Sequence, residues 1–369
     1  MTKYLKREKT FNSKLFVRLL PSVDFNYDYV KIDNNKKVIY VRCLQDLARG
    51  VKQKNPNFWA FCTDGILWNA SQDEIFETVA SDWYDDIFNG VSGIILAYGQ
   101  TGSGKTFTTS GLWHPFPNRG LILRILSQLI VEAKQKQETT KITLGISYIE
   151  FIGETVRDLI NGKMIDKIQE VIENPILSEE WAWRAIFKAE CQKTYVEGAP
   201  YKGSNKGHSI LTFYIHSESL IDTDPIITHS KVHIIDMAGI DNYGHKTSNW
   251  KDKYTVGQSN LSKCLIEQVI ICLSGTSWKS GTHICPYKSC RFLIFLHDTL
   301  RPSCHIRFIA HIHGNDPNLS QTISSLKFGE KLKGFKPTKI KTNFETDCFL
   351  QIKNLEVSKN KFFYIVLFF

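Results

Sequence analysis

The chain has 369 residues, of which 42% are hydrophobic and 22% are charged, a balance typical of a soluble globular protein and unlike a disordered or membrane-embedded chain. No apolar run reaches the roughly 18 residues that a membrane-spanning helix needs, and the amino terminus lacks the apolar core of a secretory signal. The 46 Lys and Arg against 37 Asp and Glu give a formal net charge of +9, which favours an acidic partner without identifying one.

Strand-like and helix-like segments alternate along almost the whole chain. Residues 15–21 are rich in β-formers and end at a proline, whereas residues 72–89 carry apolar side chains at helical spacing. The apolar run 94–98 is a predicted strand that leads into a glycine loop. The later predicted elements are helices at 120–136, 257–274, 291–300 and 321–334, and strands at 141–151, 208–217, 231–236 and 305–313.

This alternation predicts a single α/β domain with a mostly parallel central sheet flanked by helices, because no Pro/Gly/Ser linker and no repeat separates two halves. We place the domain at residues 14–336. Residues 1–13 are then an amino-terminal extension, and residues 337–369 are a short tail in which no coiled-coil heptads are evident.

The glycine loop matches the pattern G-x-x-x-x-G-K-[ST] and lies between a predicted strand and a predicted helix. Its residues are Gly99, Gln100, Thr101, Gly102, Ser103, Gly104, Lys105 and Thr106. Three glycines allow the backbone N–H groups to point inward at phosphate oxygens. Lys105 is expected to reach the β- and γ-phosphates, and the Thr106 hydroxyl to bind Mg²⁺. The sequence therefore predicts a P-loop NTPase.

A second motif supplies what a magnesium nucleotide needs on a neighbouring strand. Asp236 closes the apolar strand 231–236, and Gly239 follows it in a D-x-x-G arrangement. The carboxylate of Asp236 is the expected second metal ligand, and the N–H of Gly239 is expected to meet the γ-phosphate.

Together these residues resemble the kinesin motor domain, and the resemblance covers about residues 15–336. It is carried by AYGQTGSGKTFTTSG (97–111), DMAGID (236–241), SNKGHSI (204–210), PYKSCRFLIFLHDTL (286–300) and TISSLKFGEKLK (322–333). Two further segments, WNASQDEIFETV and NRGLILRIL, are most similar to the ninth kinesin family, which is associated with cilia and flagella. The resemblance implies ATP and Mg²⁺ as cofactors and microtubules as the partner, with axonemal partners and a cytoskeletal, ciliary or flagellar location. Nucleic acid and membrane are not expected as partners.

The resemblance also implies roles for individual residues. Arg18, Pro21 and Phe107 correspond to the purine pocket, although the family's second arginine there is Leu20. In the first switch the family's two serines, arginine and third serine fall on Ser204, Asn205, Lys206 and Gly207. Ser204 is expected to help hold the metal, and Asn205 and Lys206 to act in catalysis.

The family closes the two switches with an arginine-to-glutamate latch, and the equivalent pair here is Lys206 and Asp241. Both replacements shorten the reach, and lysine lacks the planar fork of arginine. Hydrolysis is therefore the step that these departures put in question.

The region 242–300 is expected to face the acidic microtubule surface. It contains seven basic residues against three acidic ones: Lys246, Lys251, Lys253, Lys263, Lys279, Lys288 and Arg291 against Asp252, Glu267 and Asp298. Three functions stay open. They are an ATP-hydrolysing microtubule motor, a hydrolysis-impaired module that binds nucleotide and docks on microtubules, and an unrelated P-loop NTPase, which is disfavoured because no guanine-reading N-K-x-D follows the switch.

Overall fold

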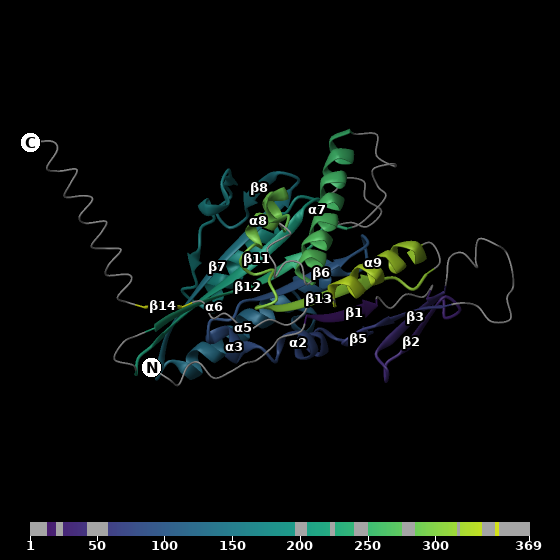
Figure 1. Cartoon of the computed structure of the whole chain (residues 1–369). Helices are drawn as coiled ribbons and strands as arrows, with labels where there is room; N and C mark the ends of the chain where they lie inside the picture. Colours follow the sequence, from purple (N-terminus) through teal and green to yellow (C-terminus); the bar gives the residue numbers. More distant parts are fainter. Residues whose placement is uncertain are drawn as a thin grey trace, which may run out of the picture.

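The computed structural model describes residues 13–19, 25–42, 58–195, 205–221, 226–239, 250–274, 285–315, 318–333 and 344–346 (Figure 1). A large twisted sheet runs through the described part, with the strand order β5-β1-β13-β6-β12-β11-β7-β8-β9, and two short strands, β10 and β14, pair with β7 and β12. The strands of this sheet are β1 (Lys14–Leu19), β5 (Gly65–Trp68), β6 (Gly93–Gly99), β7 (Thr140–Ile152), β8 (Thr155–Asp158), β9 (Met164–Ile165), β10 (Asn174–Pro175), β11 (His208–Ser219), β12 (Ile226–Asp236), β13 (His305–Ile312) and β14 (Phe344–Thr346).

The predicted α/β fold is confirmed, and the parallel part of the sheet is the part that carries the glycine loop. Strands β5, β1, β13, β6 and β12 pair in parallel, whereas β12, β11, β7, β8 and β9 pair antiparallel. Every residue of β6 is buried, which is expected for a strand between two parallel neighbours. In the register of the sheet Asp236 on β12 lies beside Ala97, and His311 on β13 lies beside Gly99. The carboxyl ends of these strands therefore meet at one edge, where α/β proteins bind ligands.

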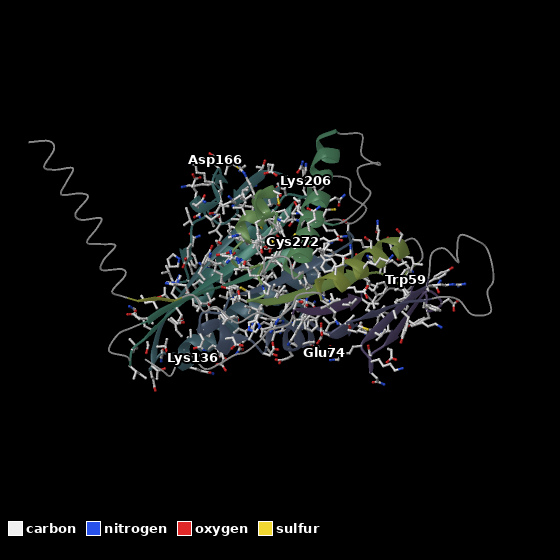
Figure 2. All side chains as sticks on the ribbon, in the orientation of Figure 1. Trp59, Glu74, Lys136, Asp166, Lys206 and Cys272 are labelled. Carbon is white, nitrogen blue, oxygen red and sulfur yellow. The ribbon has the colours of Figure 1, made fainter. Side chains whose placement is uncertain are left out.

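Helices cover both faces of the sheet. The cluster of buried side chains on one face includes residues of α7 (Trp250–Ser274), α8 (Arg291–Phe295) and α9 (Leu319–Leu332). The cluster on the other face includes residues of α2 (Gln72–Ala80), α3 (Tyr84–Phe88), α5 (Leu121–Lys136) and α6 (Glu179–Glu190). Figure 2 shows Lys206 and Cys272 on the α7 side of the sheet, and Glu74 and Lys136 on the opposite side.

The single helix expected at 72–89 is two helices. Ser71 and Glu74 form a capping box that starts α2, and α2 ends at Ala80. The break after it brings Asp82 into ion pairs with Lys14 and with Arg307, whose guanidinium is buried on β13. Helix α3 then begins at Tyr84. Tertiary ion pairs, which the helical spacing of the apolar residues does not reveal, therefore lie at the break between the two helices.

The remaining predicted elements are found close to their expected positions, with three differences. Strand β12 and helix α7 begin earlier than expected, at Ile226 and Trp250, and α8 ends at Phe295. A three-stranded antiparallel sheet of β2 (Val30–Asp33), β3 (Val38–Arg42) and β4 (Phe58–Cys62) was not expected from the sequence. Helix α6 was not expected either, although Ser178 caps it and its buried residues recur at helical spacing.

Residues 344–346 form β14 and pair antiparallel with residues 226–228 of β12. This part of the predicted tail therefore lies along the edge of β12 that faces away from β11, the edge that β6 occupies further along the strand, and the predicted domain boundaries stay predictions. Within the described residues no helix is long and apolar enough to span a bilayer.

Candidate nucleotide site

The glycine loop has the backbone conformation that its sequence predicts. Gly99, Gly102 and Gly104 have φ values of 141°, 79° and 90°, a region that other residues rarely adopt. At Gly99 a side chain would also collide with the carbonyl oxygen of His311 on β13. The loop is therefore tied to the strand beside it, and the short helix α4 (Lys105–Thr109) begins directly after Gly104.

Lys105 is buried and lies across the inside of the loop. Its Nζ donates hydrogen bonds to the carbonyl oxygens of Gly99 at 3.1 Å and Gln100 at 2.7 Å. The hydroxyl of Ser103 also donates to Gln100 O, at 2.7 Å. The ammonium is thus already held at the loop, where phosphate oxygens can replace the carbonyl oxygens as its acceptors.

Thr106, Asp236 and Asn205 converge next to the loop. The Thr106 hydroxyl donates to Asp236 Oδ2 at 2.7 Å, and Asn205 Nδ2 donates to the same oxygen at 2.6 Å and to Thr106 Oγ1 at 3.2 Å. The other oxygens of the two side chains, Asp236 Oδ1 and Asn205 Oδ1, are buried without a hydrogen-bond partner among the described residues. Burial raises the pKa of Asp236, against the opposing effect of Lys193. A hard divalent cation prefers oxygen ligands, so this donor set fits Mg²⁺.

Gly239 closes the site from the other side. A side chain at this position would collide with the hydroxyl of Thr101 in the loop. The turn before it is fixed because Ala238 N donates to His208 Nδ1 at 3.0 Å, and Met237 N donates to Ala97 O at 3.1 Å. The D-x-x-G segment therefore packs directly on the glycine loop, as its proposed role requires.

The approach to Asn205 is held by a buried carboxylate on β7. Glu150 accepts hydrogen bonds from the backbone N and the hydroxyl of Thr194, at 2.9 and 3.0 Å. Thr194 O in turn accepts from Lys206 N at 2.8 Å, and Tyr195 forms a β-bridge with Asn205. This chain of contacts positions the Asn205 amide over Asp236.

Two expected residues of this region lie outside the described residues. Ser204 and Asp241 are not described, and neither is Pro21 of the purine pocket. The Lys206–Asp241 latch is therefore untested.

Arg18 and Phe107, the two described residues of the expected purine pocket, lie against each other. Arg18 Cζ lies 5.2 Å from the centre of the half-buried Phe107 ring. Arg18 Nη1 donates to Thr108 Oγ1 at 2.6 Å, and burial lowers the pKa of Arg18 to about 10. His311 Nε2 lies 2.6 Å from the same hydroxyl. Burial holds the pKa of His311 well below its usual value, so this imidazole is neutral and braces α4 from β13.

The sequence interpretation missed a buried ion pair beside the expected metal ligand Asp236. Lys193 has a fully buried side chain, and its Nζ lies 2.9 Å from Glu190 Oε2 and 3.9 Å from Asp236 Oδ2. Glu190 Oε1 accepts hydrogen bonds from Ser110 Oγ, at 2.6 Å, and from the hydroxyl of Tyr148. Burial alone would lower the pKa of Lys193, but Glu190, Tyr148 and Asp236 hold it well above its usual value. The sequence feature that could have predicted this ion pair is the i,i+3 spacing of Glu190 and Lys193 at the end of an amphipathic segment.

The expected microtubule face is only partly described, and one of its lysines is not on the surface. Lys263 on α7 is 9% exposed and its Nζ lies 5.3 Å from the centre of the Phe328 ring, so Lys263 does not belong to an exposed basic face. Lys288 is exposed, whereas Arg291 is half-buried and donates to Ile165 O at 3.3 Å. Lys246 and Lys279 lie outside the described residues, and so do the side chains of Lys251, Asp252 and Lys253.

Comparison with known proteins agrees with the predicted fold and family. The family model for the kinesin motor domain matches residues 31–335. The chain is 30% identical over 358 residues to the human kinesin-like protein KIF9, and the match covers 92% of this chain and 44% of that protein. It is 25% identical over 364 residues to the kinesin-like protein KLP1 of Chlamydomonas reinhardtii, with 93% of this chain and 45% of that protein covered. The chain thus spans less than half the length of these relatives.

A solved structure has the same fold. The microtubule-bound dimer of KIF14 with AMP-PNP superimposes with a TM-score of 0.78, covering 91% of this chain and 97% of that chain at 20% sequence identity. With a family model that covers most of the chain, and with the glycine loop and the D-x-x-G segment beside one edge of the sheet, the chain belongs to the kinesin motor domain family.

Proposed function

We propose that this chain is an ATP-hydrolysing, microtubule-binding kinesin motor domain. The observation that carries the proposal is the convergence of Thr106, Asp236 and Asn205 beside Lys105, with two buried side-chain oxygens that have no hydrogen-bond partner among the described residues. Such a site offers oxygen ligands to a cation and an ammonium to phosphate in the same place, which is what a magnesium nucleotide requires.

The proposed cofactor is ATP with Mg²⁺. Thr106, Asp236 and Ser204 would hold the metal, which when bound neutralises charge on the β- and γ-phosphate oxygens. Residues 99–104 would surround the phosphates with backbone N–H groups, Lys105 would bind the β- and γ-phosphates, and the N–H of Gly239 would meet the γ-phosphate. Phe107, Arg18 and Pro21 would receive the purine, with the Phe107 ring available for stacking.

A hydrolysis-impaired docking module is the second candidate function, and Asn205 favours it. The Asn205 side-chain amide donates hydrogen bonds to both Thr106 Oγ1 and Asp236 Oδ2. The amide must therefore turn away before both oxygens can face a cation. Lys206 and Asp241 stand in place of the family's arginine and glutamate and weaken the proposed latch, which also favours impaired hydrolysis. Positioning of the attacking water is most of what a protein contributes to phosphoryl transfer, so these changes act on turnover more than on binding.

The two functions are distinguished by steady-state ATP turnover of the chain with and without microtubules, together with microtubule co-sedimentation. Stimulation by microtubules selects the motor. Tight co-sedimentation without stimulation selects the module. Absence of both nucleotide binding and co-sedimentation would refute the two proposals together.

We expect the latch to be repaired by restoring both of its ends. Lys206→Arg combined with Asp241→Glu should raise microtubule-stimulated turnover more than the two single changes added, because contacting residues couple by about 0.5–3 kcal/mol, or roughly 2- to 150-fold. Lys188→Arg on the exposed side of α6 is the control and should change nothing. Purely additive single and double variants would show that the two side chains never meet.

We also propose an axonemal, ciliary or flagellar location within the cytoskeleton. The support is the likeness to the ninth kinesin family and the matches to KIF9 and KLP1. Fluorescent tagging of the full-length protein in ciliated cells tests it, and exclusion of the tagged protein from cilia would contradict it.

A further inference from the structure

Two histidines face each other at the end of the sheet that lies away from the glycine loop. His216 on β11 and His229 on β12 are directly paired across the strands, and their Nδ1 atoms are 2.6 Å apart. His216 is eight residues beyond His208, which is about 26 Å along the strand. This distance separates the pair from the nucleotide site. Both rings are partly exposed, so the pair is accessible to solvent.

A carboxylate orients the first of these rings. His216 Nε2 lies 2.7 Å from Glu173 Oε1, at the amino end of the short strand β10. A carboxylate accepts hydrogen bonds, so Nε2 carries the proton and Nδ1 of the neutral ring presents its lone pair toward His229. A histidine that donates one N–H to a carboxylate and points its other nitrogen outward is the arrangement that carboxylate–histidine–metal sites use.

The sheet is built to let Glu173 reach His216. Glu173 crosses β7 at Gly145, where an added Cβ would lie 2.6 Å from Glu173 Cγ and closer still to Oε1. Any larger residue at position 145 would displace the carboxylate. Three elements, β7, β10 and β11, therefore cooperate to hold one imidazole in one orientation.

We propose that His216 and His229 bind a late first-row divalent cation such as Zn²⁺ through their Nδ1 atoms, with Glu173 orienting His216. At Zn–N distances of about 2.0–2.1 Å, two imidazole nitrogens at a tetrahedral angle are about 3.3 Å apart. The present 2.6 Å therefore has to widen by less than 1 Å, which small side-chain rotations supply. In the metal-bound form each neutral ring carries its proton on Nε2 and binds the metal through Nδ1, and water completes the coordination.

The surroundings do not oppose a cation. The lysine of the adjacent cross-strand pair on this face, Lys231, is paired with Asp298 at 2.5 Å. Among the described residues no group of three or more His, Cys, Asp or Glu converges on one metal-sized position, so the described part of the chain contributes two histidine ligands and an orienting carboxylate to the proposed site. Imidazole nitrogen suits Zn²⁺, Ni²⁺ and Cu²⁺ and does not suit Mg²⁺. Metal in this site would pin β11 to β12, beside the residues of β12 that pair with β14.

The test is titration of the whole chain with Zn²⁺ at neutral pH by calorimetry, in excess Mg²⁺ to saturate the nucleotide site. We expect one saturable site whose affinity falls at least tenfold in His216→Gln and in His229→Gln. Glu173→Gln and Gly145→Ala should each weaken it by about 10- to 100-fold, as the loss of an orienting partner does. His297→Gln removes an exposed imidazole that contacts an arginine and a tyrosine, and this control should bind as the parent does.

The chain also has nine cysteines, so the ligand type needs its own measurement. The Co²⁺-loaded protein should lack the intense charge-transfer absorption that thiolate ligands produce. Parent-like Zn²⁺ affinity in both histidine variants, or a thiolate band that persists in them, would overturn the site. If the histidine variants lose binding while Glu173→Gln and Gly145→Ala keep it, the assigned role of Glu173 is overturned. Thermal melting without metal checks that each variant is folded.

Discussion

Lys105→Ala should abolish nucleotide binding at micromolar ATP. The ammonium is buried at the loop and is the cation that would face the β- and γ-phosphates. Truncating one member of a buried charge pair costs about 2–5 kcal/mol, which corresponds to roughly 30- to 5,000-fold in affinity. Titration of a fluorescent ATP analogue in the presence of Mg²⁺ measures the effect. An unchanged affinity would mean that the P-loop assignment is wrong.

The control for this variant must separate binding from folding, because alanine also removes the hydrogen bonds from Lys105 to Gly99 O and Gln100 O. Lys188→Ala on the exposed side of α6 removes a lysine without touching the loop and should bind nucleotide normally. Thermal unfolding of Lys105→Ala without nucleotide should stay close to that of the parent chain. A large loss of stability would show that Lys105 has a structural role in the loop as well.

Glu190→Gln should destabilise the fold by about 3–5 kcal/mol, because it leaves the Lys193 ammonium fully buried without its carboxylate. Lys193→Met should also destabilise it, since Glu190 would then be a buried carboxylate without its cation. The double variant should lose less stability than the two single variants added, because the uncompensated charge is removed. Urea unfolding of the three variants measures this coupling, and strict additivity would contradict the ion pair.

The pH dependence of the Glu190→Gln effect has a definite sign. Burial would raise the pKa of Glu190, but Lys193 and the hydrogen bonds from Ser110 and Tyr148 hold it below its usual value. A carboxylate with a lowered pKa in the folded state contributes stability above its unfolded pKa of about 4.3, and this contribution is lost as the pH falls through the folded pKa. The stability difference between the parent and Glu190→Gln should therefore be constant from neutral pH to about pH 5 and narrow below it.

The same pair offers a test of function, because Lys193 Nζ lies 3.9 Å from the proposed metal ligand Asp236. An internal cation at this distance disfavours a second cation beside the same carboxylate. Glu190→Gln combined with Lys193→Met removes the cation beside the proposed metal position, while the net charge of the pair stays zero. Mg²⁺ titration of this double variant measures the resulting change in Mg²⁺ affinity.

Local sequence patterns were sufficient for the glycine loop and for most elements. The loop needs three glycines and a preceding buried strand, and both are contiguous in the chain between residues 93 and 104. The D-x-x-G segment could be placed because Asp236 ends an apolar strand, and parallel strands bring their carboxyl ends to one edge. The single helix at 72–89 was a wrong prediction, because the helical spacing of apolar residues continues across a break at which Asp82 pairs with the distant residues Lys14 and Arg307.

The sequence by itself determined that the chain is an α/β P-loop protein with kinesin motifs in family order, because those properties depend on neighbouring residues and on periodicity. Only the tertiary structure decided which polar groups are buried together. Lysine is usually a surface residue, but Lys263 is covered by α9. Glu173, His216 and His229 are far apart in the sequence and come together through the pairing of strands. Such contacts follow from strand register and from the packing of helices on the sheet, and a one-residue shift in either would separate the partners without changing any local pattern.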